Sequence, residues 1–513
     1  MRRILIVATL AALSVSATYG TYVWSAVGVN SSNLRDAVKV VNIRKHQAAL
    51  QTVADSNSGV RASGTPGFAA SAAYVRSKLE EAGYVVTELP FQFPYFQENS
   101  PPVFERTQPL PGQVYVEGTD FFTMTYSGST DADGVEAVLQ KAGGIILPPG
   151  ANPSTSASGC TAADFAGFVP GNIALIQRGT CTFALKAQNA KAAGASAAII
   201  FNEGQPGRQE ALQGTLGGPI DLPVIGASFA VGDALAAMTP GPTIHIKTDT
   251  ISELRNTSNL MAETTGRSDR VVVVGAHLDS VAEGPGIQDN GSGTASNLEL
   301  AIQMKKLGIK PVNKVRFMWF GAEEAGLLGS ENYVASLTAR QKKDIALNLN
   351  FDMIASPNFV RFVYDGDGSS TPDAGPNGSA TIEDVFAKYF AAKGLPFEPT
   401  AFDGRSDYGP FIDAGIPAGG LFTGAEELKT PEEEAIYGGT AGVALDRCYH
   451  QACDDYENNN LVVFEEMADA TADAVLQFAM TTSAVKGTSK ANDQAVVRVD
   501  AKSLLYKGSQ LQR

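Results

Sequence analysis

The chain has 513 residues, a hydrophobic content of 44% and a formal net charge of -15. This length is sufficient for two or three globular domains with cores of ordinary size. The charge argues against a nucleic-acid partner, because phosphate binding needs a basic patch and the lysines and arginines do not cluster in that way. The acidic balance mainly indicates a soluble protein.

The N-terminus predicts an export signal over residues 1–30. Arg2 and Arg3 precede an apolar run at residues 4–13, which is followed by a small-residue cleavage site. We therefore expect a secreted or periplasmic protein with no stable membrane span after cleavage. A retained N-terminal anchor is the alternative, because the weakly polar residues 19–29 could lengthen the apolar segment.

The next segments predict an α/β domain that is interrupted. Residues 31–96 contain a helix-like stretch at 71–83 followed by a strand-like run. Residues 97–249 then differ in composition, with Pro, Gly and Thr in the first third and a strand–turn–helix–strand pattern at 172–203. We expect an inserted, β-rich domain over 97–249. A single continuous domain is the alternative, which the length disfavours.

The second part of the α/β domain is predicted over residues 250–482. Strands and helices alternate there, as in a sheet that carries helices on both faces. Residues 483–513 are polar and slightly basic, so we expect a C-terminal tail.

Four cysteines fall into two local pairs, Cys160 with Cys181 and Cys448 with Cys453. Export favours disulfides, and the short separations favour this local pairing among the three possible connectivities. A zinc–thiolate site at the second pair is the rival interpretation, but no further thiol pair lies nearby in the sequence.

Histidine and carboxylate residues follow several predicted strands. The apolar run at residues 271–274 leads to His277 and Asp279, and the run at 315–320 leads to adjacent glutamates. In an open α/β sheet, ligands bind beyond the carboxyl ends of such strands. The candidates as a set are His277, Asp289, Glu323, Glu324, Asp352 and His450.

Imidazole and carboxylate together favour zinc over magnesium or calcium. Two histidines among this many acids are too many ligands for one tetrahedral zinc, so the sequence predicts two Zn²⁺ ions per chain. Asp289 precedes a predicted helix and is the candidate bridge, with a flexible solvent turn as the alternative. Side chains of neighbouring residues at a strand end start in opposite directions, so one of Glu323 and Glu324 can bind metal while the other acts as a base. Two zinc ions acidify a shared water, which implies hydrolysis.

Other acids and histidines carry weaker expectations. Asp279 and Asp454 are candidates to hold the outer N–H of His277 and His450, with ordinary turn acids as the alternative. The remaining histidines, His46 and His245, are expected to be structural. The loop DGDGSS, which begins at Asp365, faintly suggests calcium, but an exposed turn is the preferred interpretation.

The ordered motifs AHLDS, QDNGSG, FGAEEAGLLGS, NFDM, GRSDYGPF and CYHQACD resemble those of the co-catalytic zinc aminopeptidases of the secreted bacterial type, related to aminopeptidase Y. The similarity covers residues 37–93 and 259–480, and residues 172–203 look like a protease-associated domain. The resemblance implies the zinc exopeptidase fold, with a mixed central sheet flanked by helices, and the removal of N-terminal residues from peptides.

Carried over position by position, the resemblance implies that His277 and Asp352 bind one zinc ion, that Glu324 and His450 bind the other, and that Asp289 bridges them. Glu323 would be the general base. Tyr449 would stabilise the oxyanion, with a packed ring as the alternative, and Arg405 would contact substrate, with a surface salt bridge as the alternative. Many relatives have a histidine where this chain has Tyr408, so the pocket near Arg405 is expected to differ.

Two other functions compete with this prediction. The first is a glutamate-carboxypeptidase-like or glutaminyl-cyclase-like enzyme of the same fold. A carboxypeptidase needs several cations for the substrate carboxylate, and Arg405 is the one obvious arginine in its region. The second is a non-catalytic, receptor-like binding protein, which should have lost metal ligands, whereas all five are present here.

Overall fold

The computed structural model describes residues 29–486. The predicted signal peptide or anchor and the predicted tail therefore lie almost entirely outside the described residues. Within residues 29–486, no helix combines the length and the apolar character needed to span a bilayer.

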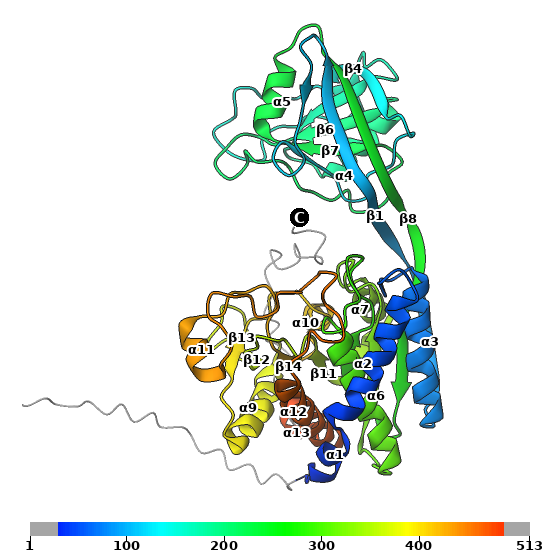
Figure 1. The fold of residues 1–513 in the computed structure, drawn as a ribbon, viewed down its shortest axis with the longest axis vertical. Helices are drawn as coiled ribbons and strands as arrows, with labels where there is room; N and C mark the ends of the chain where they lie inside the picture. The colour runs from blue at the N-terminus through cyan, green and yellow to red at the C-terminus, as the bar shows by residue number, and fades with distance from the viewer. Residues whose placement is uncertain (1–28, 487–513) are drawn as a thin grey trace, which may run out of the picture.

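Two long antiparallel strands connect the two regions of the molecule (Figure 1). β1 (Val86–Gln108) and β8 (Thr243–Glu263) pair along most of their length and run from the lower α/β region into the upper one. The predicted domain boundaries at residues 97 and 249 both fall within these strands. We call the upper region the insert and the lower region the peptidase region, after the family that its motifs resemble.

The peptidase region is built on a mixed sheet with the order β13-β12-β14-β11-β9-β10-β8. Its central strands are parallel, whereas β8 is antiparallel to β10 and β12 is antiparallel to β14. The fold class predicted from the sequence is confirmed. The bounds are β9 (Arg267–His277), β10 (Asn313–Phe320), β11 (Ile345–Phe351), β12 (Phe362–Tyr364), β13 (Glu398–Thr400) and β14 (Ala418–Phe422).

Helices cover both faces of this sheet because successive strand residues point to opposite sides. In β9, Val272 and Val274 belong to the larger core, whereas Val271 and Val273 belong to a second core on the other face. The larger core packs under α1 (Ser32–Ala37), α2 (Val40–Asp55), α3 (Pro66–Glu81), α6 (Gly291–Lys306), α9 (Ser379–Lys393) and α12 (Leu461–Met480).

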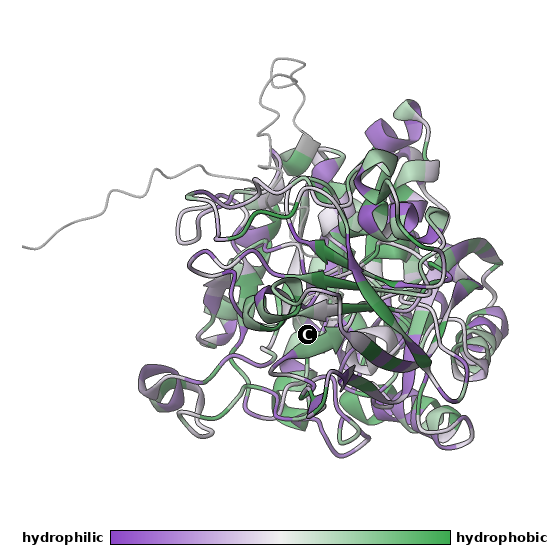
Figure 2. Cartoon of the chain, turned by 90° about the horizontal axis from the view of Figure 1, so that it is seen from above, coloured by the Kyte–Doolittle hydropathy of each residue, from purple (hydrophilic) through white to green (hydrophobic). Residues whose placement is uncertain are grey.

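The second core packs under α7 (Leu328–Ser336) and α10 (Gly409–Asp413). Figure 2, which looks down on the insert, shows hydrophobic residues toward the middle of the molecule and many hydrophilic residues at its periphery. The remaining helices of this region are short: α8 (Ala339–Asp344), α11 (Pro431–Tyr437) and α13 (Ser483–Lys486).

The insert contains its own largely parallel sheet. β4 through β7 pair in parallel in chain order, β3 is antiparallel to β7, and β4 joins β8. The predicted disulfide between Cys160 and Cys181 is present. The elements are β2 (Gln113–Val114), β3 (Phe121–Thr123), β4 (Val135–Lys141), β5 (Ile173–Gln177), β6 (Ala197–Phe201), β7 (Val224–Ala227), the 3-10 helix η1 (Ala162–Phe165), α4 (Phe183–Ala192) and α5 (Phe229–Ala236).

Candidate metal centre

The candidate ligands meet at the carboxyl ends of the central parallel strands. His277 is the last residue of β9, Asp352 directly follows β11, and Glu323 and Glu324 lie in the loop after β10. Asp289 lies two residues before α6, and the predicted Cys448–Cys453 disulfide, which is present, encloses His450. In an open α/β sheet, ligands bind beyond the carboxyl ends of the strands, and these residues lie there.

Asp289 lies between the two histidines and presents one oxygen to each. His277 Nε2 is 3.2 Å from Asp289 Oδ1 and 3.3 Å from Asp352 Oδ1. His450 Nε2 is 3.1 Å from Asp289 Oδ2 and 3.2 Å from Glu324 Oε2. Three residues thus surround each half of the cluster, and Asp289 is common to both.

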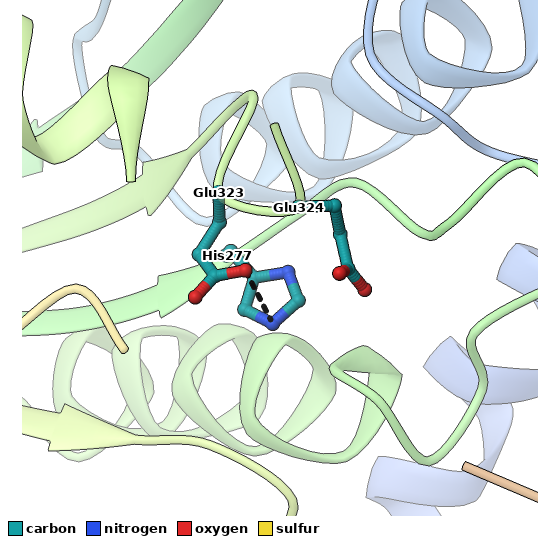
Figure 3. A group of neighbouring side chains, drawn as sticks. All are labelled: His277, Glu323 and Glu324. Carbon is teal, nitrogen blue, oxygen red and sulfur yellow. Dashed lines mark ion pairs between the residues drawn. The ribbon is translucent and has the colours of Figure 1, made fainter. Parts of the chain in front are cut away.

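Glu323 occupies a different position from Glu324. Figure 3 shows both side chains extending from the same loop toward the imidazole of His277, on opposite sides of the ring. Glu323 Oε2 is 4.0 Å from His277 Nε2, which is longer than the other contacts of that nitrogen. The two glutamates therefore approach His277 from different sides, although one oxygen of each lies within 4.8 Å of the other.

The donor set fits a pair of zinc ions. Nitrogen and oxygen ligands bound at 2.0–2.2 Å around one tetrahedral zinc lie about 3.3 Å apart, which is the spacing found here. Two buried carboxylate oxygens, Glu324 Oε1 and Asp352 Oδ1, have no hydrogen-bond partner among the described residues. Buried charged oxygens without partners are costly, and a bound cation would remove that cost.

Burial and the neighbouring charges shift the pKa values of the side chains in the cluster. Burial raises the pKa of Glu324 to about 7, although His450 opposes the shift. Burial also raises the pKa of Glu323 well above its ordinary value, and the negative charges of Glu324 and Asp407 add to this effect. Burial would lower the pKa of His277, but the nearby Asp352 and Glu323 carboxylates outweigh it and hold that pKa well above the usual range. The cluster therefore favours positive charge, either as protons or as a cation.

Asp279 faces His277 Nδ1, whereas Asp454 contacts the backbone before α6 and not His450. The backbone carbonyl of Asp279 is 3.1 Å from His277 Nδ1, whereas its carboxylate is 3.7 Å away and accepts from the Glu323 backbone N–H. Asp454 accepts hydrogen bonds from the backbone N–H groups of Gln288 (2.8 Å) and Asp289 (2.9 Å). No hydrogen bond joins Asp454 to His450 among the described residues. Asp454 thus fixes the backbone of the shared carboxylate instead of an imidazole.

Sequence reasoning missed two residues that support the cluster. Ser406 Oγ donates to Asp352 Oδ2 at 2.6 Å and accepts from Asn350 Nδ2. Arg61 is fully buried and donates to the carbonyls of Leu278, Pro285 and Gly286 in the loop that leads to Asp289. Ser406 lies within the GRSD motif and could have been noticed, but no sequence signal connects Arg61 with a loop more than 200 residues away.

Arg405 and Tyr449 lie beside His450 and contact each other. The Tyr449 ring stacks on the His450 ring with centroids 3.7 Å apart, and Arg405 Nη2 donates to the Tyr449 hydroxyl at 3.1 Å. Arg405 also forms a 2.7 Å ion pair with Glu426. Both residues line a small cavity of about 70 Å³ at the cluster.

Tyr408 closes the loop that carries Arg405. Its side chain is buried against Tyr364 and Phe402, and its hydroxyl donates to Asp403 Oδ1 at 2.7 Å and accepts from the Gly404 N–H. These contacts fix residues 403 and 404 next to Arg405. The loop next to Arg405 is therefore shaped by a residue in which this sequence departs from the motif.

The other two histidines lie away from the cluster. His46 contacts the Tyr74 hydroxyl and Glu299, and His245 contacts Glu105 and the Asp133 carbonyl. Each of these ring nitrogens faces one partner, whereas His277 Nε2 faces several carboxylates.

Comparison with known proteins agrees with this geometry. Residues 259–475 match the family model "Peptidase family M28", and residues 143–235 match "PA domain". An aminopeptidase of Pseudomonas aeruginosa is 47% identical over 448 residues, which cover 86% of this chain and 82% of that protein. The chain belongs to peptidase family M28. The resemblance stated from the motifs is thereby confirmed, including a PA domain within the insert.

Two solved structures that this chain resembles are aminopeptidases. The aminopeptidase from Aneurinibacillus sp. strain AM-1 is 27% identical, with a TM-score of 0.61 over 87% of this M28 chain and 96% of that chain. The zinc aminopeptidase BSAP from Bacillus subtilis is 25% identical, with a TM-score of 0.54 over 85% and 94% of the two chains. These matches span both the peptidase region and the insert.

Proposed function

We propose that this M28 peptidase is a zinc-dependent aminopeptidase that removes the N-terminal residue of peptides and uses two zinc ions. The observation that carries the proposal is the placement of Asp289, whose two oxygens face two different imidazoles. The names of the related proteins, an aminopeptidase at 47% identity and a zinc aminopeptidase of the same fold, support the activity and the metal.

Each zinc ion would have three protein ligands. His277 and Asp352 would hold the first ion, Glu324 and His450 the second, and Asp289 would bind both. When bound, zinc ions polarise a substrate carbonyl and lower the pKa of a coordinated water toward about 7. Three protein ligands for each ion leave positions open for substrate and water, which is typical of catalytic sites.

Glu323 is the proposed general base. Its carboxylate is buried, lies beside the cluster, and is more distant from His277 than the proposed ligands are. It can accept a proton from the attacking water and deliver that proton to the departing amine. A carboxylate whose pKa is raised by burial suits both steps, because proton transfer is most effective when that pKa approaches the working pH.

Tyr449 is the proposed oxyanion donor. Its hydroxyl accepts a hydrogen bond from Arg405, and Tyr449 lines the small cavity at the cluster. Arg405 is held by Glu426 and would act by positioning Tyr449. A donor held in place before reaction stabilises the negative charge that develops on a carbonyl oxygen.

The small cavity favours an aminopeptidase over a carboxypeptidase. Arg405 is the one basic side chain apart from the histidines that lines it, and that guanidinium is already paired with Glu426. A substrate carboxylate would therefore lack a free cation in the described residues, whereas an α-amine would enter surroundings rich in carboxylates. The presence of all five proposed ligands argues against a receptor-like role without catalysis.

The test combines metal analysis with hydrolysis of Leu-p-nitroanilide. We expect about two zinc ions per chain, activity that a chelator abolishes and zinc restores, and no hydrolysis of N-acetyl-Leu-p-nitroanilide. The blocked substrate is the matched control, because it differs only at the amine. Activity that persists in metal-free protein would overturn the proposal, and so would preferential cleavage of an N-blocked dipeptide.

We further infer that the protein is exported, to the periplasm or the medium. Its four cysteines form two disulfides, and stable disulfides are characteristic of oxidising compartments. Detection of the full activity outside the cytoplasm of the native host, with an N-terminus that begins after residue 1, tests this inference. Retention of the protein in the cytoplasm would contradict it.

A further inference from the structure

A cavity of about 390 Å³ lies between the peptidase region and the insert and opens on the metal cluster. Glu324, His450 and Asp279 line its inner end, and Thr123 and Thr125 of the insert line its outer part. It is much larger than the 70 Å³ cavity, which shares Glu324 and His450 with it. An aminopeptidase needs one subsite for the N-terminal residue and another for the rest of the peptide. The small cavity is suited in size to the first and the large cavity to the second.

The free edge of β1 forms one wall of the larger cavity. Six consecutive residues, from Phe93 to Glu98, line it. Side chains alternate between the two faces of a strand, so a cavity on one face would meet only every second residue. Six residues in succession place the cavity along an edge. No residue of β8, which pairs with the other edge, lines the cavity.

The main-chain groups on this edge have no strand partner. Among the described residues, β1 pairs only with β8 and, at Glu105 and Arg106, with β2. Thr250 lies opposite Glu98, and its N–H donates to Ser129 Oγ at 3.3 Å, away from β1. The pair is therefore of the non-hydrogen-bonded kind, in which the main-chain groups of both residues point outward.

The same orientation follows at every second residue of β1. Phe96 and Pro94 share the parity of Glu98, so their main-chain groups also face the cavity edge. Pro94 supports this assignment independently, because a proline has no N–H to donate and is tolerated where that position faces away from the neighbouring strand. The exposed edge thus offers the carbonyl of Pro94 and both main-chain groups of Phe96 and Glu98.

We propose that the part of a peptide substrate that follows the scissile bond binds as an added strand along residues 93–98 of β1. An unpaired strand edge is a template for another extended chain. Phe93 packs at the peptidase end beside Ala322, and Glu98 accepts from Thr123 at the insert end. A peptide whose N-terminus is at the metal cluster therefore runs parallel to β1, toward the insert.

This binding mode defines the substrate class. Main-chain hydrogen bonds recognise an extended peptide whatever its side chains, so the enzyme would act on oligopeptides of varied sequence. Six strand residues span about 20 Å, and binding should improve with peptide length until that span is filled. The insert is needed for this mode because it forms the far wall of the cavity.

The inference rests on the proposed aminopeptidase function, and its test uses the intact, zinc-loaded enzyme. The first measurement is kcat/KM for a series Leu-Ala, Leu-Ala₂ and so on to Leu-Ala₆, each amidated at its C-terminus. The second is a scan of Leu-Ala₆ in which each amide nitrogen beyond the scissile bond is methylated in turn. Leu-p-nitroanilide serves as the reference, since it has no chain beyond the scissile bond.

We expect kcat/KM to rise about tenfold or more along the series and then level off, because each main-chain hydrogen bond contributes about three- to tenfold. N-methylation should reduce kcat/KM at alternate positions only. No gain with length, or equal effects of methylation at all positions, would overturn the added-strand model. Failure of the aminopeptidase function is distinguishable, because Leu-p-nitroanilide itself would then not be hydrolysed.

Discussion

Two clusters in the peptidase region contain several acidic residues each. They differ in whether the carboxylate oxygens already accept hydrogen bonds. Asp365, Asp367 and Glu383 have carboxylate oxygens within 4.8 Å of one another, as the residues of the metal cluster do. The backbone already serves the first cluster: Asp365 accepts the N–H groups of Ser370 at 2.8 Å and Thr371 at 2.7 Å. In the metal cluster, Glu324 Oε1 and Asp352 Oδ1 are buried and accept no hydrogen bond from the described residues, although Asp352 Oδ1 lies 3.3 Å from His277 Nε2.

The difference indicates when a group of acids can bind metal. An acid whose oxygens accept backbone N–H groups closes a turn and gains little from a cation. An acid held by its backbone, with its side-chain oxygens left free, retains the capacity to coordinate. The Asp289 backbone is fixed by Asp454, and its two carboxylate oxygens remain directed at His277 and His450.

Removal of the shared carboxylate should have the largest effect. Asp289→Ala is expected to lose both zinc ions and all detectable hydrolysis of Leu-p-nitroanilide, because three ligands on each side fall to two. Elemental analysis and kinetics on the same preparation measure the two losses together.

Asp365→Ala is the matched control in the backbone-satisfied cluster. It should retain zinc and activity and lose only stability, by about 1–3 kcal/mol, since it leaves backbone N–H groups without an acceptor. Denaturant unfolding measures that loss. Loss of zinc in the Asp365 variant but not in the Asp289 variant would reverse the assignment of the two clusters.

Glu323→Gln separates the base from the ligands. The variant should keep its zinc content while kcat falls by about 10²- to 10⁴-fold, because an amide cannot accept the proton. Glu324→Gln at the adjacent position is the comparison, and it should lower zinc content as well. If both variants lost metal equally, Glu323 would be a ligand and the base would lie elsewhere.

Tyr449→Phe tests the neighbouring loop. The phenylalanine keeps the ring that stacks on His450 but removes the hydroxyl, so zinc content should be unchanged. Loss of one oxyanion donor should reduce kcat by about 10²- to 10³-fold with little change in KM. A kcat within twofold of the parent enzyme would leave Tyr449 as a packing residue.

The sequence predicts this cluster well because strand patterns are local. Runs such as residues 271–274 predict buried parallel strands, and the carboxyl ends of such strands lie at one edge of a sheet. His277, Asp352 and the two glutamates follow from that rule alone. The family resemblance was needed to decide which glutamate binds metal and which acts as the base. Their neighbouring positions in the sequence predict only that the two side chains point in different directions.

The contacts that the sequence could not predict are those between distant loops. Asp454 was expected to face His450, its neighbour in the sequence, but its carboxylate accepts from the backbone at residues 288 and 289. Arg61 reaches three carbonyls of the 278–286 loop from another part of the fold. Such contacts depend on how loops pack in three dimensions, and neither periodicity nor spacing encodes that packing.

Ser406 allows the same comparison at the level of a single hydrogen bond to a proposed ligand. It gives Asp352 one side-chain hydrogen bond, so Ser406→Ala should leave that ligand less well oriented and weaken zinc affinity by about 10- to 100-fold, the usual effect of losing an outer-shell partner. Ser369→Ala is the matched control, because Ser369 donates to Asp365 and Asp367 through its backbone N–H, which alanine retains. Competition with a chromogenic chelator measures the affinity of each variant. Equal zinc affinity in both variants would mean that β11 alone orients Asp352. The hydrogen bond from Ser406 would then have no effect on zinc affinity.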